Sequence, residues 1–248
     1  MRSRSYTLAV GLAAGLVAHV LGCVGAVSAA PAAPTGVVVA RYAFDAATGS
    51  IADNSGRGHT LSVIAGHGGA VRTIAHGTGR ALAFPDKCTT GPKRRCPHVV
   101  LQTRPAADLN PGTSPIAYGA AVRLARSQTT KGQNILQKGY SATTSQYKLQ
   151  IDGSAGRPSC VLVDDRKPAI RLVRSSASVA DGAWHAVECR RAGALFSILV
   201  DGVVRGVLAI PAGLSVRNGG PLSVGGKGAS ANNDQFQGAL DNVWVRIG

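Results

Sequence analysis

The segment that decides the fold reads DGAWHAVECRRAGALFSILVDGVV and spans residues 181–204. Near its end, Asp201-Gly202 separates two apolar runs, and an Asp-Gly pair in that position is the strongest short-range signal for a β-hairpin. Asp152-Gly153 repeats the signal earlier in the chain. The segment therefore predicts antiparallel strands joined by tight turns.

The residues before this hairpin alternate as a strand does. Successive side chains of a strand point to opposite faces of the sheet. Trp184 and Glu188 therefore share one face, while His185, Val187 and Cys189 share the other.

The composition extends this pattern to the whole chain. Of 248 residues, 45% are hydrophobic and only 4% aromatic, with 32 Gly and 12 Pro, which suits many short strands and turns. We predict an all-β fold, a two-sheet antiparallel jelly-roll sandwich. The expected strands are 37–44, 60–64, 81–84, 98–102, 116–124, 135–137, 146–151, 160–163, 170–173, 184–190, 196–200, 203–210, 222–224 and 240–247.

The N-terminal residues 1–29 have the pattern of a secretory signal peptide: two Arg, an apolar run and small residues at the cleavage position. A Pro/Ala-rich linker, 30–36, follows, and 37–248 forms one domain. Two alternatives are an uncleaved membrane anchor and a lipoprotein anchored through Cys23, which ends a lipobox-like Val-Leu-Gly-Cys. We predict a secreted protein.

Basic residues outnumber acidic ones, with 27 Lys and Arg against 12 Asp and Glu, which gives a net charge of +15. Removal of the signal takes away Arg2 and Arg4 and leaves +13. Such a field favours polyanions outside the cell, with acidic polysaccharide foremost. The alternative is that the charge serves solubility alone. Basic and aromatic residues interleave too sparsely to favour nucleic acid.

Four cysteines remain after removal of the signal, an even number in a chain that enters an oxidising compartment. Three pairings are possible. Cys88 with Cys96 closes the shortest loop and leaves Cys160 with Cys189, a bridge expected to join neighbouring strands. A zinc site is the competing interpretation, but there is no C-x-x-C pair.

Five segments in order carry a family resemblance: YAFD at 42–45, ADNSGRGH at 52–59, GRALAF at 79–84, DGAWHAV at 181–187 and FQGALDNVWV at 236–245. Together they resemble the laminin-G-like and pentraxin-like domains of the concanavalin A-like lectin/glucanase superfamily. The resemblance implies a jelly roll whose first and last strands lie side by side.

The superfamily includes lectins, adhesive modules and glycan-cleaving enzymes, so the residues must decide the function. A glycosidase needs two carboxylates that flank the scissile bond. Glu188 is the only glutamate, and Asp164-Asp165 is expected in a turn. We therefore predict a secreted binding module for carbohydrate or another extracellular partner, with no catalytic residue. The alternatives are a glycosidase or lyase on the same fold and a protein-binding adhesion domain.

Two groups of residues are predicted to bind the ligand. Lys93, Arg94 and Arg95 lie in the loop between Cys88 and Cys96, and Arg guanidinium groups bind sulfate, phosphate or carboxylate bidentately. Tyr140 and Tyr147, which lie within two residues of Lys138 and Lys148, are expected to form one mixed stacking and charged contact.

Calcium is the one cofactor that the resemblance suggests. If the terminal strands pair, Asp53 approaches Asp241 and the two supply hard oxygen ligands. The alternative is that Asp53 only forms a turn.

Two groups of ring side chains are expected to have structural roles. Trp184 and Trp244 fall in family-pattern strands and are predicted to lie in the core. His59, His67 and His76 are interpreted as exposed loop histidines rather than as a metal site.

Overall fold

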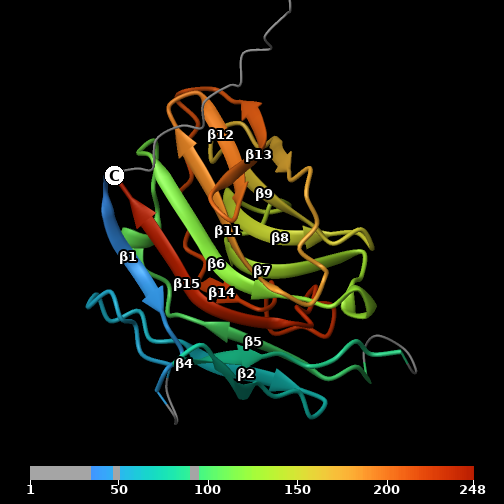
Figure 1. The fold of residues 1–248 in the computed structure, drawn as a ribbon. Coiled ribbons are helices and arrows are strands. Elements are labelled where there is room, and N and C mark those ends of the chain that lie inside the picture. Colours follow the sequence, from blue (N-terminus) through green and yellow to red (C-terminus); the bar gives the residue numbers. More distant parts are fainter. Residues whose placement is uncertain (1–34, 47–50, 90–94) are drawn as a thin grey trace, which may run out of the picture.

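The computed structural model describes residues 35–46, 51–89 and 95–248, and these form two stacked antiparallel sheets (Figure 1). The predicted all-β sandwich is confirmed. The signal peptide, Cys23 and most of the linker lie outside the described residues, so these assignments stay predictions. Within the described part of the chain, no helix is long and apolar enough to cross a membrane.

The larger sheet has eight strands and the smaller one seven. The first contains β1 (Val37–Tyr42), β3 (Arg72–His76), β4 (Gly79–Ala83), β6 (Ile116–Arg123), β11 (Trp184–Ala192), β12 (Leu195–Val200), β13 (Val203–Ala209) and β15 (Ala239–Ile247). The second contains β2 (Ser62–Gly66), β5 (His98–Gln102), β7 (Gly132–Lys138), β8 (Gln146–Asp152), β9 (Arg157–Val163), β10 (Ile170–Arg174) and β14 (Leu222–Val224). The short 3-10 helices η2 (Ala107–Leu109) and η3 (Arg126–Gln128) lie in the connections.

The first and last strands pair, as the resemblance implies. β1, drawn in blue, runs antiparallel to β15, drawn in red, with Val37 opposite Ile247 (Figure 1). β15 pairs with β6 on its other side, while β4 pairs with Ala239 and Leu240 at the start of β15, on the same side as β1.

The Asp201-Gly202 hairpin is confirmed. It joins β12 to β13, and both turn residues have positive φ, 53° and 76°, which a type I′ turn requires. The strand missing from the sequence prediction is β3. None of its residues is fully buried, because β3 is an edge strand, so its sequence lacks the alternation that marks a half-buried strand.

Both predicted disulfides form, Cys88–Cys96 and Cys160–Cys189. The position of the Cys160–Cys189 bridge differs from the expectation that it joins neighbouring strands. Cys160 lies in β9 of the smaller sheet and Cys189 in β11 of the larger, so the bridge crosses the core and links the two sheets rather than neighbouring strands. Both cysteines are fully buried in the core.

Alternation along β11 also separates two adjacent arginines. Arg190 lies on the outer face, whereas Arg191 points inward and is only 1% exposed. The Arg191 guanidinium donates hydrogen bonds to the carbonyl oxygens of Gly112, Ser114 and Ala212. Arg191 therefore holds two connecting segments against the sandwich and contributes nothing to a surface patch.

We expect the bridge between the sheets to stabilise the fold more than the other one. It closes a loop of 29 residues, against 8 for Cys88–Cys96. Loop-closure entropy predicts a loss of about 3 to 4 kcal/mol for Cys160→Ala with Cys189→Ala and about 2 to 3 kcal/mol for Cys88→Ala with Cys96→Ala. Chemical denaturation of the two double variants measures both losses. A larger loss from the second variant would contradict this order.

Candidate functional site

Small side chains form a trough along the outer face of β6. Ile116, Tyr118, Ala120 and Val122 point into the core, so the alternate residues face outward. Apart from the terminal arginine of β6, these outward positions hold only Ala or Gly: Ala117, Gly119 and Ala121. A central strand without large outward side chains leaves a depression in the sheet surface.

Large side chains from the neighbouring strands form the walls. Gly119 lies between Trp244 of β15 and Glu188 of β11, and Ala117 lies between Arg246 and Arg190 of the same strands. The resulting arginine groove has a volume of about 430 Å³. It is lined by Val38, Arg41, Ala117, Glu188, Arg190, Asn242, Trp244 and Arg246.

A β-bulge in β15 aims Trp244 into this groove. Asn242 takes a positive φ of 44°, and the register shifts between Asp241 and Trp244. Leu240 before the bulge and Val243 after it both face the core, so the extra residue reverses the alternation. Trp244 therefore lies on the outer face, over Gly119.

One ion pair, Arg190 with Glu188, lies in the groove and neutralises its only lining carboxylate. Arg190 donates two hydrogen bonds to the Glu188 carboxylate, one of them from Nη2 to Oε2 at 2.9 Å. The Glu188 carboxylate raises the pKa of Arg190 above its usual value. Arg41 and Arg246 also line the groove, so its three guanidinium groups exceed its one carboxylate.

Trp184 lies on the same face, at the opposite end of β6, opposite Arg123. The His76 ring stacks on it with centroids 4.0 Å apart, and the Arg123 guanidinium lies 5.3 Å from the ring centroid. His76 Nδ1 contacts Asp241 Oδ2 at 2.5 Å. Trp184 is thus held in a polar cluster that reaches from β3 to β11.

The prediction that both tryptophans lie in the core is therefore wrong. Neither is fully buried. The outward position of Trp184 could have been predicted from the sequence. Val187 and Cys189 are core residues, and alternation along the strand places Trp184 on the opposite face. The outward position of Trp244 depends on the β-bulge in β15, which the sequence analysis did not predict.

Sequence comparison identifies the family. The Laminin_G_3 model of the concanavalin A-like lectin/glucanases superfamily matches residues 100–246. This match covers more than half of the chain. The chain belongs to the concanavalin A-like lectin/glucanases superfamily. A search of curated proteins finds no significant match.

Solved structures share the fold of this concanavalin A-like domain at low identity. Domain 4 of AbnA, an extracellular arabinanase from Geobacillus stearothermophilus, solved with arabinotriose, is 13% identical with a TM-score of 0.63, covering 86% of this chain and 93% of that one. The binding domain of Paraclostridial Mosquitocidal Protein 1 is 14% identical, with a TM-score of 0.62 and coverage of 85% and 48%. The binding domain of botulinum neurotoxin DC in complex with SialylT is 8% identical, with a TM-score of 0.58 and coverage of 84% and 47%. The concanavalin A-like chain thus spans about half the length of the two toxin domains.

Of the predicted ligand residues, the structure describes Arg95, Tyr140 and Tyr147. Lys93 and Arg94 lie outside the described residues, and Arg95 is exposed next to Cys96. Tyr140 is 38% exposed, and its hydroxyl donates to the Lys227 carbonyl oxygen. Tyr147 is fully buried beside the Tyr118 ring, so the predicted Tyr140–Tyr147 contact is corrected: only Tyr140 offers a surface to a ligand.

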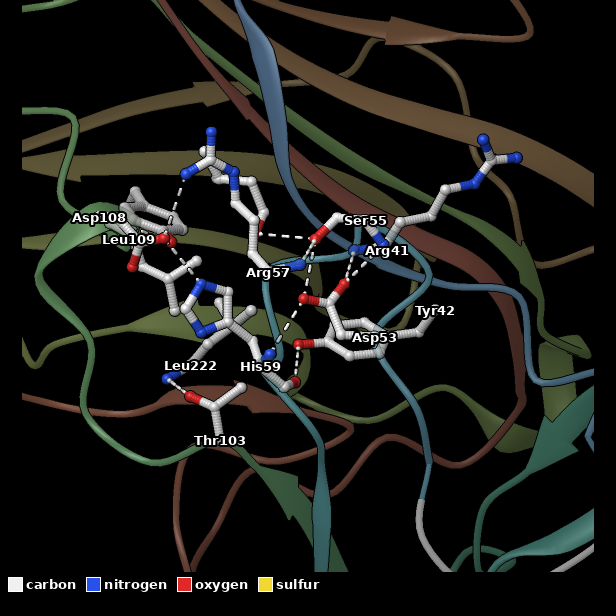
Figure 2. A network of polar contacts seen from close by, with 12 residues as sticks. Arg41, Tyr42, Asp53, Ser55, Arg57, His59, Thr103, Asp108, Leu109 and Leu222 are labelled. Atoms are coloured by element: carbon white, nitrogen blue, oxygen red, sulfur yellow. Dashed lines mark hydrogen bonds and ion pairs between the residues drawn. The ribbon is translucent and has the colours of Figure 1, made fainter.

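The two carboxylates proposed for calcium are also separate. Asp53 accepts hydrogen bonds from Arg41 N, from Ser55 N and Oγ, and from His59 N (Figure 2). Burial alone would raise the pKa of Asp53, but these donors lower it below its usual value. Because the Arg41 N–H points away from β15 toward Asp53, β1 lies between Asp53 and the strand that carries Asp241.

This arrangement does not fit a calcium ion shared by Asp53 and Asp241. Both Asp53 oxygens already accept two protein donors each, and the Asp241 oxygens contact His76 Nδ1 and Asn242 N. Over the described ranges, no group of three or more His, Cys, Asp or Glu side chains is placed to hold a metal.

The remaining singled-out residues have separate partners. His59 contacts Asp108 (Figure 2), His67 lies near the His98 ring, and His76 contacts Asp241. Asp164 accepts from Arg166 N and Asp165 accepts from Ser215 Oγ, which agrees with the expected turn.

Gly119 is expected to be indispensable to the groove. A Cβ there would lie 2.5 Å from the Val187 carbonyl oxygen and 3.2 Å from the Trp244 ring. Gly119→Ala should lower the free energy of unfolding by about 1 to 3 kcal/mol, because overpacking forces the sheet and Trp244 to shift. Chemical denaturation measures the loss. Gly132→Ala in β7 is the matched control, since a Cβ there meets nothing within 4 Å, and an equal loss in both would refute the argument.

His185 should make stability depend on pH. Its ring lies between Asp201, 2.8 Å from Nδ1, and Asp181, 3.1 Å from Nε2. Burial lowers the pKa of His185, but the two carboxylates outweigh it and raise the pKa above its usual value. The charged ring therefore stabilises the fold fully below about pH 6.5, and this is lost as pH rises through the raised pKa.

The matching measurement is the melting temperature of wild type and His185→Gln at several pH values. The wild type should exceed the variant most near pH 5.5, and the difference should shrink above neutral pH. A difference that grows with pH would contradict the assignment.

Proposed function

We propose that this protein is a secreted, non-catalytic module that binds acidic polysaccharide in the arginine groove. The observation that carries the proposal is the position of Arg41, Arg190 and Arg246 around the partly exposed Trp244 ring. An aromatic face packs against the apolar face of a sugar ring, and guanidinium groups bind its carboxylate or sulfate groups.

The shape of the groove supports binding along a chain. The groove runs across β1, β15, β6 and β11, on the outer face of the sheet, and its floor is made of small residues. Trp184 lies further along the same face, where its ring packs against His76 and Arg123. An extended polymer can therefore contact several positions without inserting an end.

The single carboxylate of the groove supports binding rather than cleavage. Among the residues that line it, only Glu188 carries a carboxylate, and Glu188 is held by Arg190. Glycoside hydrolysis by the usual route needs a second carboxylate about 5 to 10 Å from the first. The groove can hold an acidic glycan but does not supply an acid and base pair.

An extracellular location is supported by two disulfides, which persist in oxidising compartments. The similar structures also support an extracellular location. One is a domain of an extracellular arabinanase in complex with arabinotriose, and others are binding domains of toxins. The loop that contains Lys93, Arg94 and Arg95 remains a second proposed contact for the polyanion.

The test compares variants that each lose two positive charges. Arg41→Gln with Arg246→Gln removes groove charges, Lys93→Gln with Arg95→Gln removes loop charges, and Arg104→Gln with Arg157→Gln removes exposed charges elsewhere. We expect the groove variant to lose at least about tenfold in affinity for heparin or a polyuronate, because charge-assisted hydrogen bonds are lost. Trp244→Ala should also weaken binding. Calorimetry at increasing salt measures each affinity.

The outcomes separate the alternatives. Equal losses in all three charge variants would mean diffuse attraction without a site. A larger loss in the loop variant would move the site to the loop between Cys88 and Cys96. Release of reducing ends from the polysaccharide would place the protein among the enzymes.

A further inference from the structure

The histidines of the domain fall into two groups. Three of the five in the described ranges have a carboxylate partner: His59 with Asp108, His76 with Asp241, and His185 with Asp181 and Asp201. The other two, His67 and His98, lie beside each other, with ring centroids 5.5 Å apart and an angle of 55° between the ring planes. Neither of them lines the arginine groove, so the proposed function leaves this pair unexplained.

A tight turn places His67 next to His98. His67 follows β2 in the turn that leads to β3, and His98 begins β5 opposite Gly66. Gly69 N donates to the Gly66 carbonyl oxygen at 3.0 Å. His67 and Gly68, between them, have positive φ of 51° and 73°. These are the features of a type I′ turn, whose central positions are dominated by Gly, Asn and Asp. A histidine in this conformation is uncommon, and its side chain projects from a fixed backbone.

Two glycines let this turn close on His98. A Cβ at Gly69 would lie 2.1 Å from the His98 carbonyl oxygen, and a Cβ at Gly66 would lie 2.4 Å from His98 Nε2. A side chain at either position would force the turn away from the ring. Because Gly66 has no side chain, the Nε2 edge of the His98 ring lies directly against the turn that carries His67.

A hydrogen bond of the His98 ring fixes which nitrogen has the lone pair. His98 Nδ1 lies 2.9 Å from the Cys96 carbonyl oxygen, which only accepts, so Nδ1 carries the proton. In the neutral ring Nε2 then has the lone pair. Cys96 is itself held by its disulfide with Cys88. Histidines that bind metals are oriented in the same way, by a contact from the other ring nitrogen to a carbonyl or carboxylate oxygen.

The separation of the two rings fits one shared metal ion. Imidazole nitrogens that bind a metal at about 2.0 Å place their ring centroids about 4.5 to 5.5 Å apart when the angle at the metal is about 90 to 120°. The observed 5.5 Å lies at the upper end of this range. His67 is exposed, so its rotamer can adjust to a bound ion.

We infer that His67 and His98 bind one Cu²⁺ ion, with water in the remaining positions. Imidazole suits copper, nickel and zinc, and Cu²⁺ forms the strongest complexes of the divalent series. A structural zinc site is closed by four protein ligands, whereas this pair supplies two, which favours Cu²⁺. The bound ion would tie the turn after β2 to the start of β5. The inference goes beyond the proposed function, because the groove and this pair share no residue.

The experiment titrates the full secreted protein, made without a polyhistidine tag, with copper(II) chloride by calorimetry, and glycine serves as a competing chelator. Pulsed EPR of the complex counts the bound imidazoles through their remote nitrogens. We expect one Cu²⁺ per chain, signals from two imidazoles and weaker binding of Zn²⁺. Free Cu²⁺ at about a hundred times its Kd should raise the melting temperature by about 5 °C, because the ion binds the folded state.

Two variants remove the ligands one at a time. His67→Asn keeps the turn, because Asn also accepts positive φ, and should lower the affinity for Cu²⁺ at least about tenfold and leave one imidazole signal. His98→Asn removes the second ligand and should have the same effect. The control is His185→Gln, which removes a histidine held between two carboxylates and should bind Cu²⁺ as the wild type does.

Four results would overturn the inference. They are no stoichiometric binding of Cu²⁺, full affinity in His67→Asn, a loss of affinity that follows His185→Gln, or tighter binding of Zn²⁺ than of Cu²⁺. Because His67 is exposed, its variant decides the question whether or not His98→Asn folds. Heparin binding is measured separately, so the groove proposal can fail while the metal proposal holds, and the reverse.

Discussion

The hydrogen-bond ladders of β15 are the constraint on which the larger sheet depends. β15 pairs with β6 along one side and with β1 and β4 along the other, so it joins the first strand of the domain to the centre of the sheet. The bulge at Asn242 lets the strand keep Leu240, Val243 and Val245 in the core while Trp244 turns outward. The bulge in β15 therefore determines both the packing of this strand on the core and the position of Trp244 in the groove.

Features with a local cause could be predicted from the sequence. The Asp201-Gly202 turn needs only two residues that accept positive φ, and the pairing of Cys88 with Cys96 follows from a short loop. Both are properties of neighbouring residues. The fold class follows from many such signals in order.

Features that depend on how strands are assigned to sheets could not be predicted. Alternation shows that Cys189 points inward but not which sheet carries Cys160, so the bridge across the core was missed. Strict alternation from Leu240 would place Trp244 inside, and only the bulge reverses this. The groove itself needs β1, β15, β6 and β11 side by side, although their residues are far apart in the sequence.

The pairing of β1 with β15 has a mechanical consequence. Gly36 N donates to the Gly248 carbonyl oxygen, so the two ends of the domain leave the sheet at the same end of one antiparallel ladder. A force that pulls these ends apart loads the hydrogen bonds one at a time, starting at Val37 and Ile247, rather than all together. The domain would peel open under a smaller tension than a sandwich whose terminal strands are loaded in shear.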